Sequence, residues 1–327
     1  MPAVNKFMPD TSIAGPSLIV LGPGGAVPGA LCMGWTGTDG LGHLNTALSF
    51  DEGATWQKTV VTTDTSIAAP ALAFHNEKLF MAWTGTDGAG LLNIMPSIDG
   101  GKSFQINKKH LVTTSDGQQK SIAEPALISY RGLLVIAWTG TDGQGLLNVA
   151  TSADEGVSWQ NKVIMPETAI DGPALTFLSG GVSGAGFTTL VIAWTGTGSE
   201  HHINTRTCSD TAFGQLGQPG FSKSTFPDTS NFGPSLTTAI SRDTGDQFVI
   251  IAWAGSDSDR RLNCGFSNNG ITFGGKKTSA ESSIAKPALT KFNVRPPDEL
   301  VYAWTGTDGE GHLNFAPGPA IGLGFSS

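Results

Sequence analysis

Carboxylates, indoles and amides recur along this chain at one fixed spacing, and these groups are suited to binding sugars. The stretch from Trp83 to Asn93, WTGTDGAGLLN, occurs in six related copies, and Trp and Asn are ten residues apart in each copy. An aromatic ring can cover the apolar face of a pyranose, while Asp and Asn side chains bond to its hydroxyls. The repeated stretch therefore predicts several similar carbohydrate sites rather than one.

The candidate ligand-binding residues are the repeated Trp, Asn and Asp side chains and two histidines. They are Trp35, Trp83, Trp138, Trp194, Trp253 and Trp304; Asn45, Asn93, Asn148, Asn204, Asn263 and Asn314; Asp39, Asp87, Asp142 and Asp308; and His43 and His312. A Trp that ends an apolar strand is more often a packing residue, and Asn can bond to the main chain across a hairpin. The fourth and fifth copies keep Trp, Gly and Asn but lose the Asp-Gly pair, so the four aspartates are the stronger candidates for ligand contacts.

The repeated stretch is expected to be a hairpin inside a larger unit of four strands. An apolar run such as Leu133 to Trp138 predicts a buried strand, and Asp-Gly predicts a two-residue turn after it. With that turn Trp83 would lie opposite Leu92, and Asn93 would point away from the face that carries Trp83. A Ser-x-Asp-x-Gly-x-Ser/Thr-aromatic turn and a fourth strand follow. Four strands in roughly 50 residues are typical of one β-propeller blade.

Six such repeats predict a single all-β domain over residues 1–327, a six-bladed β-propeller of four-stranded antiparallel blades. The repeats start near residues 12, 66, 121, 169, 230 and 283. Met8 to Ser12 matches Phe226 to Ser230, which precedes the fifth repeat, and the last repeat lacks a fourth strand of its own. We therefore expect residues 3–9 to complete the last blade and close the ring. The predicted sites are clefts between neighbouring blades, on the face that carries the hairpins.

Two families resemble this chain. The Ser-x-Asp turns, such as Ser49 to Trp56, resemble the Asp boxes of sialidase-type β-propellers, and the near-identical blades resemble bacterial β-propeller lectins. The lectin resemblance implies a multivalent carbohydrate-binding protein. The sialidase resemblance implies an arginine triad and a Tyr–Glu pair, but no Arg recurs at a matched place, and Tyr130 and Tyr302 lie by strands that lead to a Trp.

We therefore expect a lectin without enzymatic activity, because repeated like groups do not supply the unlike groups that catalysis needs. A sialidase-like glycoside hydrolase and a protein-interaction propeller are the alternatives.

Composition limits the partners. The net charge is -8 and basic residues are scattered, which argues against nucleic acid, and the apolar runs are too short to insert in a membrane. The expected partners are glycans or glycoconjugates. No metal or cofactor is expected, since His201 and His202 lack a third ligand at useful spacing. Three cysteines and no visible secretory signal predict synthesis in the cytoplasm, with release by a non-classical route left open. The sequence does not fix the oligomeric state.

Overall fold

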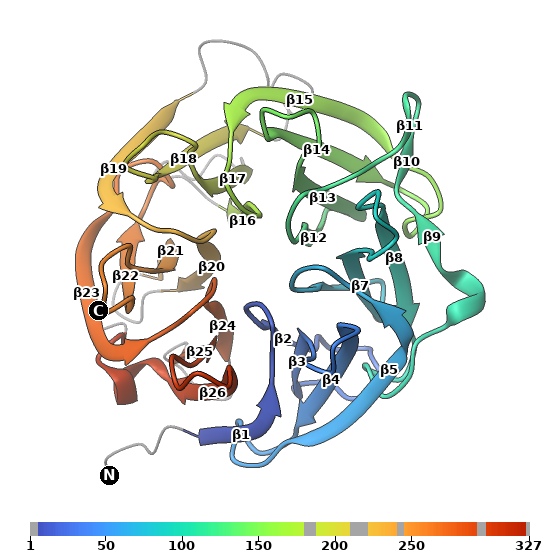
Figure 1. Cartoon of the computed structure of the whole chain (residues 1–327), viewed down its shortest axis with the longest axis horizontal. Coiled ribbons are helices and arrows are strands. Elements are labelled where there is room, and N and C mark those ends of the chain that lie inside the picture. Colours follow the sequence, from blue (N-terminus) through green and yellow to red (C-terminus); the bar gives the residue numbers. More distant parts are fainter. Residues whose placement is uncertain (1–5, 180–187, 210–221, 241–244, 293–298, 325–327) are drawn as a thin grey trace.

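The computed structural model is a ring of six four-stranded antiparallel sheets around a central axis (Figure 1). It describes residues 6–179, 188–209, 222–240, 245–292 and 299–324. Each sheet is one blade, and its strands follow one another from the axis outward. This arrangement confirms the predicted six-bladed all-β propeller.

The blades are numbered in chain order, and their strands are given from the axis outward. The first blade holds β2 (Ser17–Val20), β3 (Leu31–Thr36), β4 (His43–Ser49) and β5 (Gln57–Thr65); the second β6 (Ala71–His75), β7 (Lys78–Thr84), β8 (Leu92–Ser97) and β9 (His110–Leu111); the third β12 (Ala126–Tyr130), β13 (Leu133–Thr139), β14 (Leu146–Ser152) and β15 (Gln160–Thr168). The fourth holds β16 (Ala174–Ser179), β17 (Thr188–Thr195), β18 (His202–Ser209) and β19 (Lys223–Thr229); the fifth β20 (Ser235–Ile240), β21 (Gln247–Ala254), β22 (Arg261–Ser267) and β23 (Gly274–Ser282); the sixth β24 (Ala288–Phe292), β25 (Glu299–Thr305), β26 (His312–Pro317) and β1 (Lys6–Thr11). A short pair, β10 (Thr113–Thr114) and β11 (Gly117–Gln118), and two 3-10 turns, Ile106–Lys108 and Gly318–Ile321, complete the elements.

The N-terminal strand closes the ring, as the sequence predicts. β1 pairs antiparallel with β26, with Lys6 opposite Phe315 and Phe7 opposite Asn314. Figure 1 shows this first strand beside the last blade. The pairing satisfies the outer edge of β26, which would otherwise be open. Residues 3–5 of the expected closing segment lie outside the described residues.

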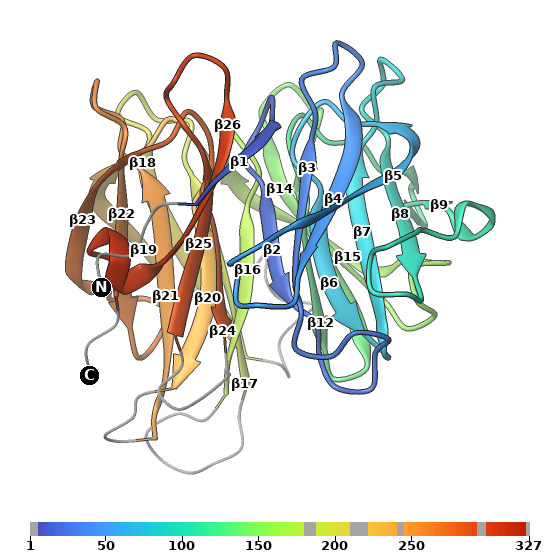
Figure 2. The same ribbon diagram turned by 90° about the horizontal axis from the view of Figure 1, so that it is seen from below.

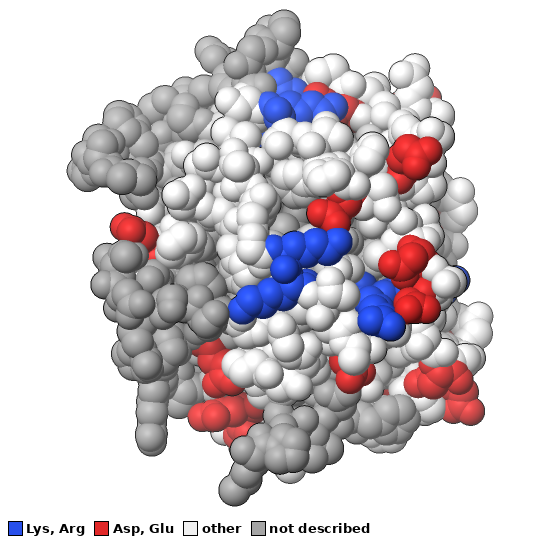
Figure 3. Space-filling view, turned by 90° about the vertical axis from the view of Figure 1, so that its left-hand side faces the viewer, with Lys and Arg blue, Asp and Glu red and all other residues white. Residues whose placement is uncertain are grey.

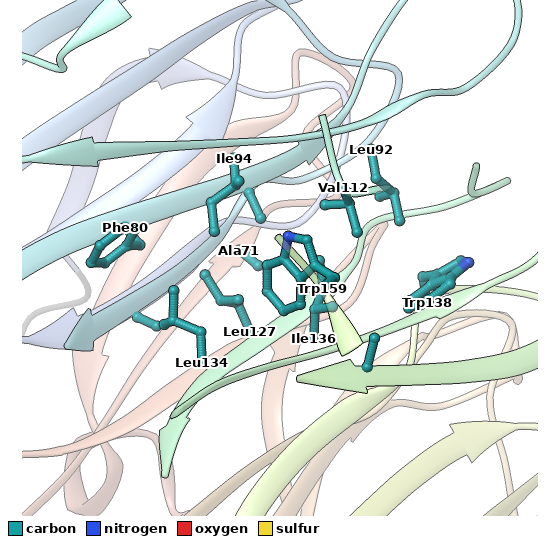
Figure 4. Packing of buried hydrophobic residues seen from close by; sticks show 13 residues of the cluster. Ala71, Phe80, Leu92, Ile94, Val112, Leu127, Leu134, Ile136, Trp138 and Trp159 are labelled. Carbon is teal, nitrogen blue, oxygen red and sulfur yellow. The ribbon is translucent and has the colours of Figure 1, made fainter. Parts of the chain in front are cut away.

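Apolar packing between neighbouring blades forms the core. One cluster joins Phe80, Leu92, Ile94 and Val112 of the second blade to Ile136, Trp138 and Trp159 of the third. Figure 4 shows Trp159 in the middle of this cluster and Trp138 at one end of it. The six repeated Trp side chains are only 1–3% exposed. Burial of this many large side chains is the main stabilising term of such a ring.

The hairpin register differs from the predicted one. Trp83 lies opposite Asn93 and Thr84 opposite Leu92, so the loop is longer than the two-residue turn that we expected. The Gly85 amide donates to the Leu91 carbonyl at 2.9 Å, which leaves five residues in the loop. Gly88 and Gly90 take left-handed φ angles of 76° and 66°, and the Asp87 carboxylate accepts the Ala89 amide at 2.8 Å.

This one-residue difference in register reverses the predicted side of Asn, because successive strand residues point to opposite faces. Trp and Asn lie opposite each other in all six blades and therefore share a face. In side view the hairpins between second and third strands project from one face of the ring (Figure 2).

Candidate functional site

Pockets open between neighbouring blades at the hairpin face, and we call them the rim pockets. The pocket between the third and fourth blades has a volume of about 390 Å³, and its neighbour between the second and third has about 300 Å³. Both lie within the usual range for small-ligand sites. The first is lined by Pro166, Glu167, Thr168, Trp194, Gly196, Thr197, Gly198, His202, Asn204, Lys223 and Thr225. The second includes Asp116, Trp138, Asp142, Asn148 and Lys162.

A lysine in the outer strand, or directly before it in the second blade, lies over the repeated Trp in five blades. The Nζ atom is 5.1–5.7 Å from the centre of the indole, a cation–π distance. The pairs are Lys58 with Trp35, Lys109 with Trp83, Lys162 with Trp138, Lys223 with Trp194, and Lys276 with Trp253. The indole is thus a packing residue whose remaining face is covered by an ammonium group.

Each of these lysines also pairs with a carboxylate that precedes the blade in sequence. The partners of the five lysines, in chain order, are Asp10, Asp64, Asp116, Glu167 and Asp228. These acids were not among the predicted site residues, although four of them stand two residues before the start of a repeat. On the side of the ring that carries β19 and β23, basic side chains lie next to acidic ones (Figure 3).

Hydroxyl groups complete the pocket. Thr168 and Thr197 approach within 2.6 Å between their hydroxyl oxygens, and similar pairs join Thr11 to Thr38, Thr65 to Thr86 and Thr229 to Ser256. In the fourth blade Thr225 Oγ1 donates to Asn204 Oδ1 at 2.7 Å. The pocket between the third and fourth blades is therefore lined by one indole together with an ammonium group, a carboxylate, an amide and several hydroxyls.

The repeated Asn residues stabilise the hairpin. The Nδ2 atom of each one donates to the main-chain carbonyl two residues earlier, at 2.7–3.1 Å. Their second role is at the pocket, because Asn148 and Asn204 line the two rim pockets. Trp and Asn line the same pocket because the observed register places them opposite each other on one face of the sheet.

The four predicted aspartates build the hairpin loops. Asp142 Oδ1 accepts the amides of Gln144 and Gly145 at 2.8 Å, and Asp39, Asp87 and Asp308 bond to their own loops in the same way. Asp142 also lines a rim pocket. In the fifth blade Asp257 keeps this role, since its Oδ1 accepts the Arg260 amide at 2.8 Å. A carboxylate at the tip therefore bonds its own loop in five blades whether or not it meets a ligand, whereas the fourth hairpin, with Gly198 at this position, forms the same register without one.

His43 and His312 lie beside aspartates of their own hairpins. His43 Nδ1 is 2.7 Å from Asp39 Oδ2, and His312 Nδ1 is 3.1 Å from Asp308 Oδ2. Burial alone would raise the pKa of Asp39, but hydrogen bonds from His43 and from three loop amides outweigh burial and lower that pKa to about 2. Within the described ranges no three His, Cys, Asp or Glu side chains gather as metal ligands, and no helix is long and apolar enough to cross a membrane.

A second group of polar residues lies on the propeller axis, and we call it the axial cluster. It consists of Glu124, Asp171 and Lys286, from the starts of the third, fourth and sixth repeats. Lys286 Nζ is 3.3 Å from Glu124 Oε1 and donates to the Pro173 carbonyl at 2.8 Å. The carboxylate of Asp171 accepts the amides of Gly172 and Gly233 at 2.8 and 2.7 Å. The adjoining cavity is small, about 130 Å³.

The environment of Glu124 favours its protonated form. Burial and the charge of Asp171 raise the pKa of Glu124 to about 8, although Lys286 opposes them. The prediction that this repeat brings only like groups together is wrong for the axis, where two carboxyl groups and an ammonium meet. The signal was present as departures from Ser-Ile-Ala-x-Pro, where Glu124 and Lys286 occupy the x position and Asp171 replaces the preceding Ala.

No protein-family model and no curated protein sequence matches the chain. Solved structures match its fold over nearly the whole length. The α-L-arabinofuranosidase of Fusarium graminearum, in complex with an iminosugar inhibitor, is 13% identical, with a TM-score of 0.69 and coverage of 98% of this chain and 99% of the enzyme. The α-L-arabinanase of Penicillium chrysogenum, in complex with arabinobiose, is 14% identical, with a TM-score of 0.67 and 97% coverage of both chains. Trypanosoma rangeli sialidase is 14% identical, with a TM-score of 0.61, and the match covers 94% of this chain and 54% of the sialidase.

These matches confirm the sialidase-type propeller as a fold; a likeness to propeller lectins is not shown by them. They also overturn the expectation that the chain has no enzymatic activity. The fold that it adopts is the fold of an arabinanase, an arabinofuranosidase and a sialidase, so absence of activity does not follow from the repeated architecture.

Proposed function

We propose that this protein is a carbohydrate-binding β-propeller and that the rim pockets bind the sugar. One observation carries the proposal: the same set of indole, amide, hydroxyl, ammonium and carboxylate groups recurs in pockets of about 300 and 390 Å³ at separate blade junctions. Sugars need many directional hydrogen bonds around a small apolar face, and this set provides them. Three solved structures of the same fold were determined with arabinobiose, an iminosugar or a sialic acid derivative bound, which supports carbohydrate as the ligand class.

The repetition of the pocket supports multivalent binding. Five blade junctions share the lysine, indole and carboxylate arrangement. Several weak sites on one rigid ring bind a surface that displays many glycans with far greater avidity than any single site.

A glycan array followed by titration calorimetry tests this function. We expect binding to a defined set of glycans with more than one ligand per chain. Replacing Thr168 and Thr197 together by Val removes the hydroxyl pair of one pocket and should lower the stoichiometry by about one. The matched control is Thr272→Val, an exposed threonine in a Ser-x-Asp-type turn. Failure to bind any glycan contradicts the function, and one ligand per chain contradicts its multivalent form.

Glycoside hydrolysis at the axial cluster is the second candidate. Burial and the charge of Asp171 raise the pKa of Glu124 to about 8, and a carboxyl group with a raised pKa is suited to act as a general acid. The structural comparisons favour this candidate more directly than a purely binding role, because the matched proteins are glycoside hydrolases.

A panel of fluorogenic arabinosides and sialosides tests the second candidate. Glu124→Gln removes the acidic proton and should lower turnover by roughly 100-fold or more. Glu52→Gln, an exposed residue of a Ser-x-Asp turn, serves as the control and should leave turnover unchanged. Unchanged turnover in Glu124→Gln, or no turnover of any glycoside in the panel, rules out hydrolysis at the axial cluster.

A further inference from the structure

The rim pockets already contain an ammonium group, which is supplied by the chain itself. In the fifth blade Lys276 Nζ lies 5.5 Å from the centre of the Trp253 ring and pairs with Asp228. An aromatic face beside a carboxylate is the arrangement that binds organic ammonium ions. The same arrangement around Lys58 and Lys223 makes it a property of the ring rather than of one blade.

The indole and the carboxylate are the fixed parts of this arrangement, and the lysine is the movable part. The repeated Trp side chains are buried, and the side chains of Asp10, Glu167 and Asp228 are only 14–24% exposed. The side chains of Lys58, Lys223 and Lys276 are 40–49% exposed. Ion pairs of such exposed lysines are weak, and the long side chain keeps its freedom to move into solvent.

We propose that these lysines are tethered occupants of sites for a primary amine, and that the ligands of the rim pockets are sugars with a free amino group. This inference rests on the proposed carbohydrate-binding function and specifies its ligand. The ammonium of the sugar replaces the lysine ammonium over the indole and on the carboxylate, so the charge of the pocket is unchanged. The sugar hydroxyls then meet the threonine pair, Thr168 and Thr197 in the third-to-fourth junction.

The pockets differ in how readily the lysine is displaced. At the second-to-third junction the exposures are reversed, with Lys162 15% and Asp116 52% exposed, and the Nζ–Oδ2 distance is 2.6 Å. Release of Lys162 would move a mostly buried ammonium out of its site. The carboxylate that it leaves, Asp116, is already exposed to solvent and therefore gains less from a new ammonium partner. The sites of Lys58, Lys223 and Lys276 therefore bind the amine first, and the pocket of Lys162 binds it last.

Calorimetry with glucosamine, N-acetylglucosamine and glucose tests the inference, since the three sugars differ only at one carbon. We expect glucosamine to bind best. Lys276→Ala removes the competing ammonium and should tighten glucosamine binding at the Trp253–Asp228 site about tenfold, which corresponds to about 1.4 kcal/mol. Lys102→Ala is the matched control, because Lys102 lies 6.0 Å from the centre of the Phe50 ring but outside the rim pockets.

The sign of the Lys276→Ala effect is decisive. Weaker glucosamine binding in this variant would show that the lysine contacts the ligand directly, and it would overturn the inference. The inference would also be overturned if N-acetylglucosamine bound as tightly as glucosamine or more tightly. In both cases a sugar still binds, so the proposed carbohydrate function stands. If none of the three sugars and no glycan on the array binds, the function and the inference both fail.

Discussion

The rim pockets and the axial cluster use the same repeat in opposite ways. At the rim, each blade contributes like residues, and the result is one pocket in several copies. At the axis, the position before the repeated Pro holds Gly15, Ala69, Glu124, Gly172, Gly233 and Lys286, so unlike side chains meet. Residues that pack between blades must suit every junction, whereas residues that face the axis only have to fit the space there.

Close packing around the axis limits where a side chain can stand. A Cβ atom on Gly172 would lie 2.3 Å from the Glu124 carbonyl oxygen, and one on Gly233 would lie 2.2 Å from the Gly172 oxygen. Glycine is therefore required at these two positions, and the larger side chains, Glu124 and Lys286, occupy the same position in other repeats. Repeated rim pockets and a single cluster of unlike groups therefore coexist in one propeller, because different positions of the repeat carry them.

The largest expected effect tests whether the rim indole belongs to the scaffold. Trp138→Ala should lower the free energy of unfolding by about 3–5 kcal/mol, because it opens a cavity in the cluster between the second and third blades. Equilibrium denaturation in urea measures it. A loss below about 1 kcal/mol would mean that the indole contributes little to packing between the blades. The rim residues would then not be constrained by packing, and the contrast with the axial residues would fail.

Two lysines provide a direct contrast between the regions. Lys286→Ala removes a mostly buried ammonium that lies 3.3 Å from the Glu124 carboxyl and donates to the Pro173 carbonyl, and this should cost about 2–3 kcal/mol. Lys276→Ala removes a half-exposed ion pair and should cost less than about 1 kcal/mol. The same denaturation experiment compares them, and equal losses would show that burial at the axis does not strengthen the contacts of its lysine.

The pH dependence of stability should depend on the axis and not on the rim. The folded pKa of Glu124 is about 8, above its ordinary value, so the folded state binds a proton that the unfolded state has lost. Stability should therefore fall as the pH rises from about 6 to about 7.5, by about 2 kcal/mol from this group. Glu124→Gln should flatten that part of the profile.

A rim carboxylate is the control for this profile. The side-chain hydrogen bond from Lys162 is the main cause that lowers the pKa of Asp116 to about 2, so Asp116 does not titrate in the same range. Asp116→Asn should leave the slope between about pH 6 and 7.5 unchanged. A slope that persists in Glu124→Gln would assign the titration to another group and remove the main chemical difference between the two regions.

Most of the fold was predictable because each blade repeats the same local signals. Apolar strands that end at Trp, loop glycines and the match between Met8–Ser12 and Phe226–Ser230 were enough to give six blades and the closing strand. The register was not predictable from Asp-Gly alone. In the second blade the five-residue loop is held by hydrogen bonds to Asp87 and by the left-handed Gly90, and the Asp-Gly pair alone does not reveal either feature.

The sites were predictable only in part, for a related reason. The repeated Trp and Asn marked the rim pockets, but the lysine and the acid that complete a pocket are about 50 residues apart and come from neighbouring blades, as Lys58 and Asp10 or Lys223 and Glu167 do. Glu124 and Lys286 are 162 residues apart, and only closure of the ring brings them together. Local patterns fix a blade, whereas contacts across the ring depend on the closed geometry.

The smallest effect concerns the aspartate at the hairpin tip, which the sequence marks as a ligand contact. Asp142→Asn keeps an oxygen that can accept the Gln144 and Gly145 amides, whereas Asp142→Ala removes it and should cost about 0.5–1 kcal/mol of stability. If the carboxylate only builds the loop, Asn preserves both stability and glycan affinity, and thermal unfolding with calorimetry will show the native behaviour. If the charge itself meets the sugar, Asn preserves stability but weakens binding about as much as Ala does. Loss of glycan affinity in Asp142→Asn would therefore show that Asp142 contacts the ligand and also stabilises the loop. A single side chain would then serve both the shared structure and the binding of the ligand.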